Sequence, residues 1–347
     1  MLLHLYIKKG VFKEIKMKKI LALAAVVALT AGVSGYAANM KDNVKFSGEV
    51  GGKFTRISCI NDNDHKHVNV DHYYSHVRIQ ADADISDKVS VSGRFTHSKI
   101  YGDLTEDVIK GMIESRIDRL HVMYKPVEGM KVDLGRTGVQ LGTDGIFYDN
   151  SFDGVVASYD KGKFAVEGGI GKIRSLEVFD IGFKFPEIKN VKYIKGSAVI
   201  NDNVNVGGFV AGATVSDTDY DFYGINAKAD ITDKVSVFGD YIKSDKPNDC
   251  AFKDIGVVYG KATEEVGTWQ AGLTYYDVDK GMFMLFGKHP FATHLVWASF
   301  AGGSFWTAQA KATVMKDVSV GTFLNLNGHI ADKDAMNSWG FELNYAF

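Results

Sequence analysis

The chain ends with nine residues, Trp339-Gly-Phe-Glu-Leu-Asn-Tyr-Ala-Phe347, in which large apolar side chains alternate with small or polar ones. Successive side chains of a β-strand point to opposite faces, so one face of this segment is wholly apolar and aromatic. That face consists of Trp339, Phe341, Leu343, Tyr345 and Phe347. It suits contact with lipid, whereas an unpaired edge this hydrophobic would aggregate. We therefore expect the terminal strand to pair with the first strand, residues 44–57, and so to close a barrel.

The same alternation recurs along the chain. Between Tyr73 and Ala83 every second residue is apolar or small, and the residues between them include His76, Arg78 and Gln80. A half-buried sheet in a soluble protein alternates in the same way. Here the segments run about 9 to 12 residues, which is the length that a tilted strand needs to cross a bilayer. Segment length therefore favours a membrane barrel.

A hairpin unit is repeated. Residues 81–95 read ADADISDKVSVSGRF and residues 227–241 read AKADITDKVSVFGDY, with looser copies from Ser197 and from Lys311. Asp, Asn and Ser favour tight turns because their side chains bond nearby backbone. Longer polar insertions separate the units, at residues 60–66, 100–114, 244–253 and 328–338.

Short turns at one end and longer loops at the other are typical of outer-membrane barrels. The sequence thus predicts an all-β fold, a transmembrane antiparallel β-barrel of about 16 strands, within a range of 16–18. An even number brings both chain ends to the same side. Residues 172–190 fit either a strand pair or a long loop.

The N-terminal residues have the form of a secretory signal. Lys18 and Lys19 precede an apolar run at residues 20–32, and Gly35 and Ala37 are small residues at the −3 and −1 positions of a cleavage site. The apolar run is too short to span a membrane, which takes about 20 residues. We interpret residues 1–37 as a signal peptide and residues 38–347 as one β-barrel domain. The first sixteen residues are either an extended basic region or the result of a start codon assigned upstream of Met17.

This interpretation makes a direct prediction about export. Mass spectrometry of the mature protein should find Ala38 at the N-terminus, because cleavage follows Ala37. Residues 1–37 retained on protein from the outer membrane would contradict the assignment.

Composition narrows the function. Residues 1–37 hold six Lys and one Glu, so the rest of the chain has 34 Lys+Arg against 41 Asp+Glu, a formal charge of −7. An acidic chain argues against nucleic acid as a partner. Cys59 and Cys250 are free to pair in an oxidising compartment or to stay as separate thiols.

The expected number of strands also indicates what the barrel encloses. About 16 strands enclose a space too wide for side chains to fill, so we expect an aqueous lumen. The chain offers no plug segment before the first strand and no soluble domain after the last. The expected function is passive diffusion of small hydrophilic solutes and ions, with no cofactor.

The pattern across residues 38–347 resembles the general porins of Gram-negative outer membranes. The segment most like that family is Val132-Asp-Leu-Gly-Arg136-Thr, followed by GVQLGTDGIFYDNSFDG from Gly138 to Gly154. The resemblance implies that this stretch leads into a third loop that folds into the pore. It also implies a homotrimer in outer-membrane lipid, and a terminal strand read by the barrel-assembly machinery.

Site residues follow from the same resemblance, position by position. Arg78 and Arg136 would be wall arginines, and Asp144, Asp149 and Asp153 would be the loop carboxylates facing them. Arg94 and Arg119 are weaker candidates for the wall. One departure is that Arg136 has the strand parity of Leu134, which points to lipid. A β-bulge at Gly135 would be needed to turn it inward.

Several other functions have less support. The barrel is alternatively a surface interaction or adhesion protein, or a substrate-specific channel. His65 and His67 suggest a metal, but His72 and His76 would lie about 13 Å apart on a strand and would not share one ion. Residues 167–172, EGGIGK, lack the spacing of a phosphate-binding loop and suit a tightly packed strand. No motif indicates an enzyme.

Overall fold

The computed structural model describes residues 44–60, 67–102, 114–143, 146–173, 177–178, 183–184, 188–215, 217–246, 249–282, 302–330, 333–334 and 336–347. The wall is built from β1 (Val44–Ile60), β2 (His67–Ser86), β3 (Val89–Gly102), β4 (Glu114–Tyr124), β5 (Met130–Leu141), β6 (Ile146–Asp160), β7 (Phe164–Ile173) and β10 (Ile188–Asn201). It continues through β11 (Val204–Val215), β12 (Thr218–Thr232), β13 (Val235–Lys246), β14 (Cys250–Gly260), β15 (Trp269–Val278), β16 (Gly303–Met315), β17 (Val318–Ile330) and β19 (Met336–Ala346).

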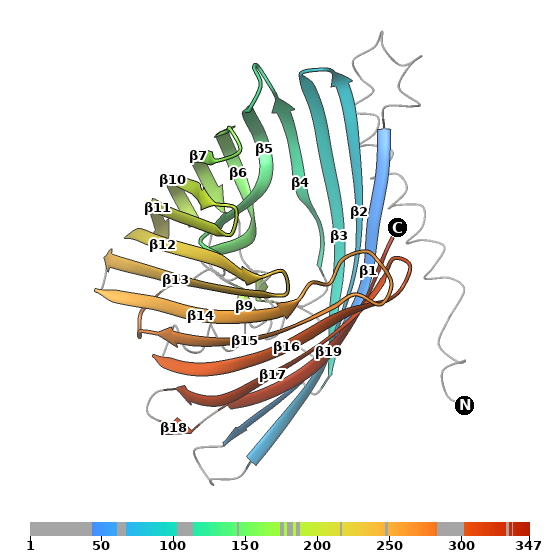
Figure 1. Ribbon diagram of the computed structural model, residues 1–347, viewed down its shortest axis with the longest axis vertical. Helices are drawn as coiled ribbons and strands as arrows, with labels where there is room; N and C mark the ends of the chain where they lie inside the picture. Colours follow the sequence, from blue (N-terminus) through green and yellow to red (C-terminus); the bar gives the residue numbers. More distant parts are fainter. Residues whose placement is uncertain are drawn as a thin grey trace.

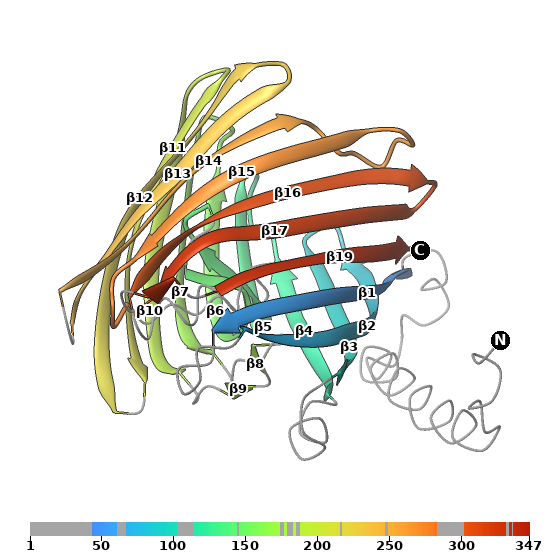
Figure 2. The ribbon, with the colours of Figure 1, turned by 90° about the horizontal axis from the view of Figure 1, so that it is seen from below.

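These strands form a closed antiparallel barrel of 16 strands within the described part of the chain (Figures 1 and 2). Each strand pairs with its neighbours along the chain, and β19 closes the ring on β1 from Glu49↔Ala346 to Cys59↔Met336. The predicted fold class and the predicted closure are therefore confirmed. None of the described residues belongs to a helix long and apolar enough to cross a membrane.

The undecided stretch, residues 172–190, is a connection. β7 ends at Ile173 and β10 begins at Ile188, and the two pair directly with each other. Between them, the two-residue strands β8 (Glu177–Val178) and β9 (Phe183–Lys184) pair only with each other. The stretch therefore adds no strand to the wall.

The two rims of the barrel differ only in part as expected, since two residues also separate β11 from β12 at the rim of the long loops and residues 261–268 link β14 to β15 at the rim of the short turns. At one rim, two residues link β2 to β3, β10 to β11, β12 to β13 and β16 to β17. At the other rim, residues 279–302 connect β15 to β16 and make the longest connection, which the sequence did not single out. Residues 244–253 were expected as a long insertion, but β13 runs to Lys246 and β14 starts at Cys250. That prediction was wrong because the strand ends that extend beyond the lipid-facing part of the barrel carry polar residues on both faces, and such a composition is also typical of a loop.

The outer face is apolar, as contact with lipid requires. Leu134, Ile170, Ile225 and Ile255 are each at least 60% exposed on it. The five apolar residues of the terminal strand are also exposed.

Aromatic contacts hold the closing seam between β19, β1 and β2. The Phe54 ring lies 5.0 Å from Tyr73, 5.3 Å from Trp339 and 5.4 Å from Phe341, measured between ring centroids. Near this cluster Arg56 donates to both carboxylate oxygens of Asp71 and lies over the Trp339 ring. Aromatic pairs contribute beyond the area they bury, so the seam is stabilised by more than its backbone ladder.

On the inner face of the barrel, inward aromatic rings pack against inward glycines on the neighbouring strand. Four such pairs are in direct register: Tyr193↔Gly169, Phe209↔Gly224, Phe238↔Gly256 and Phe323↔Gly340. A Cβ added at any of these glycines would come within 2.6 Å of its partner ring. The glycines therefore let the rings lie flat against the wall. This explains the glycine-rich stretch at residues 167–172 as a seat for Tyr193.

One of these glycines gives a stability prediction. A Cβ at Gly340 would lie 2.3 Å from the Phe54 carbonyl oxygen as well as 2.5 Å from the Phe323 ring, so Gly340→Ala must shift backbone at the seam. We expect a loss of about 1–3 kcal/mol, the usual cost of overpacking. Urea unfolding in detergent, followed by the heat-dependent gel mobility of barrels, measures it.

Gly52→Ala is the matched control, since Gly52 lies on the same β1–β19 pair and its added Cβ would meet only the Tyr74 carbonyl, at 3.9 Å. Equal midpoints for the two variants would contradict the packing argument.

Candidate functional site: the inward-folded hairpin

The end of the β5–β6 hairpin leaves the barrel wall. The pairing of β4 with β5 stops at Leu120↔Arg136, whereas β5 and β6 stay paired with each other as far as Leu141↔Ile146. The departure begins at Gly135, whose φ of 122° lies in the region that favours glycine. An added Cβ there would also lie 2.4 Å from the Leu120 carbonyl oxygen. Residues 137–143 and 146–151 therefore form the two sides of a flap, and this flap is the predicted inward-folded loop.

The tip of the flap is held across the lumen. The Thr143 backbone N–H donates to both carboxylate oxygens of Asp240, at 2.8 and 3.0 Å, and Asn226 Nδ2 donates to Thr143 Oγ1 at 3.2 Å. Asn226 and Asp240 are register partners on β12 and β13, which share no edge with β5. A hairpin that starts at β5 reaches these strands only by crossing the interior.

Apolar packing fixes the body of the flap. Val139 and Leu141 of the flap, and Phe152 where β6 rejoins the wall, are buried in one cluster with Ile173, Val191 and Phe209 of the inner wall. The Phe152 ring meets the Tyr193 ring edge-on, with centroids 5.9 Å apart. Burying a side chain such as Leu or Phe contributes about 1.5–3 kcal/mol. The flap is therefore anchored along its length against β7, β10 and β11.

The two expected wall arginines are each paired. Arg136 donates to both carboxylate oxygens of Asp153, at 2.5 and 3.0 Å, and to the Ile117 carbonyl at 2.6 Å. Its side chain is 19% exposed. The β5–β6 register shows no shift at Gly135, where Gly135 faces Gly154, so the bulge that an inward Arg136 was expected to need is absent from this described pair. Arg136 stays in register with Leu120, at the point where the flap leaves the wall.

Arg78 lies on β2 and donates to Glu49 Oε1 at 2.9 Å, while His76 Nε2 contacts the same oxygen. The structure therefore brings Arg136 and Asp153 together and gives Arg78 a partner on β1. Asp144 and the side chain of Asp149 lie outside the described residues.

A β-bulge adds a second charged cluster at the base of the flap. Arg94 faces Arg119 and Phe95 faces Ile117, so Asp118 is the extra residue on β4. The buried Asp118 carboxylate accepts from Arg94 at 2.9 and 2.8 Å. Arg119 donates to the Asp118 carbonyl at 2.7 Å and to Ser151 Oγ of the flap at 3.2 Å.

The sequence identified Arg94 and Arg119 only as weaker candidates and missed Glu49, Asp118, Asn226 and Asp240. Strand parity places Glu49 and Asp240 on inner faces, but no local pattern signals that either one binds a distant residue. Asp118 has the parity of the lipid-facing Leu120, and only the bulge turns it toward Arg94.

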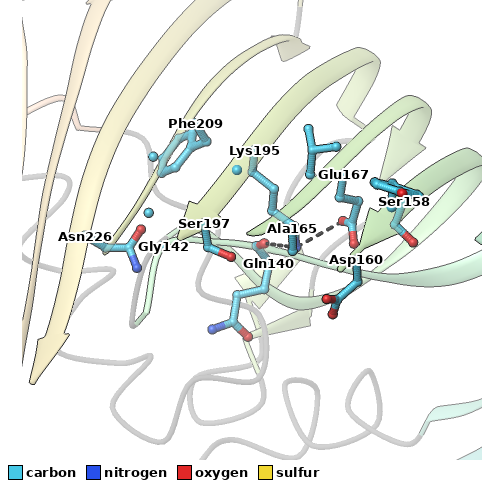
Figure 3. Close-up of a pocket in the computed structure, with 15 residues that line it drawn as sticks. Gln140, Gly142, Ser158, Asp160, Ala165, Glu167, Lys195, Ser197, Phe209 and Asn226 are labelled. Carbon is cyan, nitrogen blue, oxygen red and sulfur yellow. Dashed lines mark hydrogen bonds and ion pairs between the residues drawn. The ribbon is translucent and has the colours of Figure 1, made fainter. Parts of the chain in front are cut away.

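A cavity of about 380 Å³ lies between the flap and the inner wall (Figure 3). Gln140 and Gly142 of the flap form one side, and Glu167, Lys195 and Ser197 belong to the facing strands. Lys195 Nζ lies 3.0 Å from Glu167 Oε1 and donates to the Gln140 carbonyl at 3.2 Å, so it links wall and flap.

The metal and disulfide alternatives gain no support from the described residues. They contain no group of three or more His, Cys, Asp or Glu side chains arranged to hold a metal ion. His65 and His67 lie outside them. Cys250 is a buried free thiol, 3.7 Å from Met282 Sδ.

The architecture matches solved outer-membrane structures over most of the chain. OprB of Pseudomonas putida superposes with a TM-score of 0.60 at 12% identity, covering 88% of this chain and 94% of OprB. The fold is porin-like. The outer membrane channel DcaP of Acinetobacter baumannii gives a TM-score of 0.56 at 14% identity, covering 88% of this chain and 98% of that one. A mutant form of the Rh. blastica porin gives 0.55 at 12% identity, covering 88% of this chain and 100% of that one.

Sequence comparison adds nothing to these structural matches. No family model matches the chain, and no curated protein does. At such low identity the resemblance establishes the fold alone.

Proposed function

We propose that the chain is a passive outer-membrane channel for small hydrophilic solutes and ions, and not an enzyme. The observation that carries the proposal is the flap, which crosses the interior and is pinned to the far wall at Thr143. A structure of this kind narrows a lumen without filling it. Charged side chains that have inward strand parity and are nevertheless exposed support a water-filled mouth at the short-turn rim: Lys45, Lys228, Asp230 and Lys311.

Swelling of liposomes that contain the purified protein tests the proposal. Uncharged solutes of increasing size should enter at rates that fall steeply with size, because the flap limits the bore. Entry that is equally slow for every solute would contradict it, and would favour the alternative of a barrel that serves surface interaction or adhesion.

The proposed constriction comprises the Arg136–Asp153 pair at the flap base and Arg78 on β2, with Asp144 and Asp149 as further carboxylates. A narrow wet gap lined by opposite charges has a transverse field that favours polar solutes. The homotrimer is proposed as well. Vibrio cholerae OmpT, which shares the fold with a TM-score of 0.52, has been solved in a trimer form.

Ion selectivity gives a prediction for this constriction. Asp153→Asn removes the carboxylate that neutralises Arg136, so the reversal potential in a salt gradient should move toward anions. The shift should shrink at 1 M salt, where the screening length falls to about 3 Å. Asp219→Asn, at an exposed strand end on β12, is the control and should leave selectivity unchanged. If the Asp153→Asn variant keeps the native ion selectivity, Asp153 does not line the constriction.

A further inference from the structure

The cavity beneath the flap is hollowed out of the wall by small residues. Ser197 on β10 lies in register with Gly207 on one side and Ala165 on the other. Its volume of about 380 Å³ lies within the range of about 300–1,000 Å³ that small-molecule sites occupy. The recess is thus large enough for a solute, and the flap covers it.

The polar groups of the recess are only partly used by the protein. Glu167 Oε1 accepts from Tyr193 at 2.8 Å and contacts Lys195 at 3.0 Å, so both contacts fall on one oxygen. Within the described residues Glu167 Oε2 has no partner. The hydroxyls of Ser158 and Ser197, which also line the recess, make no hydrogen bond to the described part of the chain.

Lys195 has capacity to spare as well. An ammonium group carries three donors, and two of those of Lys195 are directed at Glu167 and at the Gln140 carbonyl. One donor therefore remains beside the vacant oxygen of Glu167. Both side chains are part-exposed, at 34% for Lys195 and 24% for Glu167, so a solute in the recess can reach them.

The charge balance indicates which solute fits. Lys195 and Glu167 neutralise each other, and so present a donor and an acceptor side by side. Asp160, which also lines the recess and whose Oδ1 accepts from the Gly162 N–H, leaves the lining with one net negative charge. A ligand carboxylate placed there would meet Glu167, and a ligand ammonium would meet Lys195. Hydroxyl groups both donate and accept, so neighbouring hydroxyls on one carbon skeleton satisfy both residues and the two serines. The Phe209 ring, which also lines the recess, offers an apolar surface to the carbon side of such a ligand.

We propose that this recess is a binding subsite for a neutral polyhydroxylated solute of the size of a monosaccharide or disaccharide, on the path through the channel. The subsite rests on the proposed channel function and makes the channel selective among the neutral solutes that it passes. The flap takes part because Gln140 positions Lys195.

Current recordings on the native protein in a planar bilayer test the subsite, with glucose and sucrose as probes and the zwitterion glycine for comparison. Each sugar should interrupt the ion current in a concentration-dependent manner, and glycine should not. Ser197→Leu fills part of the recess without touching the Lys195 contacts, so it should weaken the sugar effect about tenfold, equivalent to about 1.4 kcal/mol of binding free energy, while the channel still inserts and conducts ions. Ser236→Leu, which replaces an inward serine on β13 away from the recess, is the matched control.

The outcomes separate the subsite from the channel. Normal ion conductance without any sugar effect would overturn the subsite and leave the channel standing. A full sugar effect in Ser197→Leu would overturn the location of the site. Interruptions by glycine as strong as those by sugars would overturn the ligand class. A folded barrel with no ion conductance would overturn the channel function itself.

Discussion

Deletion of Phe347 should leave almost no barrel in the outer membrane, with the exported chain degraded or aggregated in the periplasm. Phe347 exchanges two backbone hydrogen bonds with Gly48, at 2.7 and 2.9 Å, and its ring occupies the place where a Cβ of Gly48 would lie. It therefore completes the pairing that closes the wall. The resemblance to general porins implies that the same residue would also be read during assembly, before the fold exists.

The level of protein in the outer membrane, measured by blotting of membrane fractions, tests this prediction. Leu343→Ala is the control, since it removes an exposed apolar side chain from the same face of β19 and should cost little. Native levels of the deletion variant would show that neither closure nor assembly depends on the last residue.

Release of the flap tip should produce the second large effect. The double variant Asn226→Ala and Asp240→Ala removes every side-chain hydrogen bond that the described residues make to Thr143 from the far wall. Leaving the Thr143 N–H without its acceptor costs about 1–3 kcal/mol, which favours displacement of the tip. Single-channel currents should then show transitions to a level about twofold higher, since a narrow segment dominates the resistance of a pore.

Asp230→Ala is the matched control, because Asp230 is an exposed aspartate four residues along β12 from Asn226, and its side chain makes no hydrogen bond to the described part of the flap. Currents in the double variant that match the native trace would mean that the tip does not limit the bore.

The sequence predicted the architecture because every strand of a lipid-facing barrel follows one rule, that its outward side chains are apolar. The parity of Trp339 to Phe347 and the recurring Val-x-Val-x-Gly hairpins are local patterns, and each fixes which face of a strand is apolar. The inner face follows no such rule. Inward rings such as Phe209 and Phe323 have the parity of lumen residues, and only the three-dimensional register reveals the glycines that seat them.

The site was less predictable for a related reason. The Gly-Arg segment located the flap, but the partners of its residues are set by topology. Thr143 and Asp240 are 97 positions apart. Asp118 changes face at a bulge, and the flap leaves the wall after a glycine in an unusual conformation. Neither change leaves a periodic trace in the sequence.

Conductance of the purified protein in a planar bilayer tests the central claim most directly. A channel narrowed by a pinned flap should insert as discrete steps of uniform, stable conductance, seen with protein whose folding is verified by heat-dependent gel mobility. A correctly folded barrel that inserts and stays silent would contradict the account.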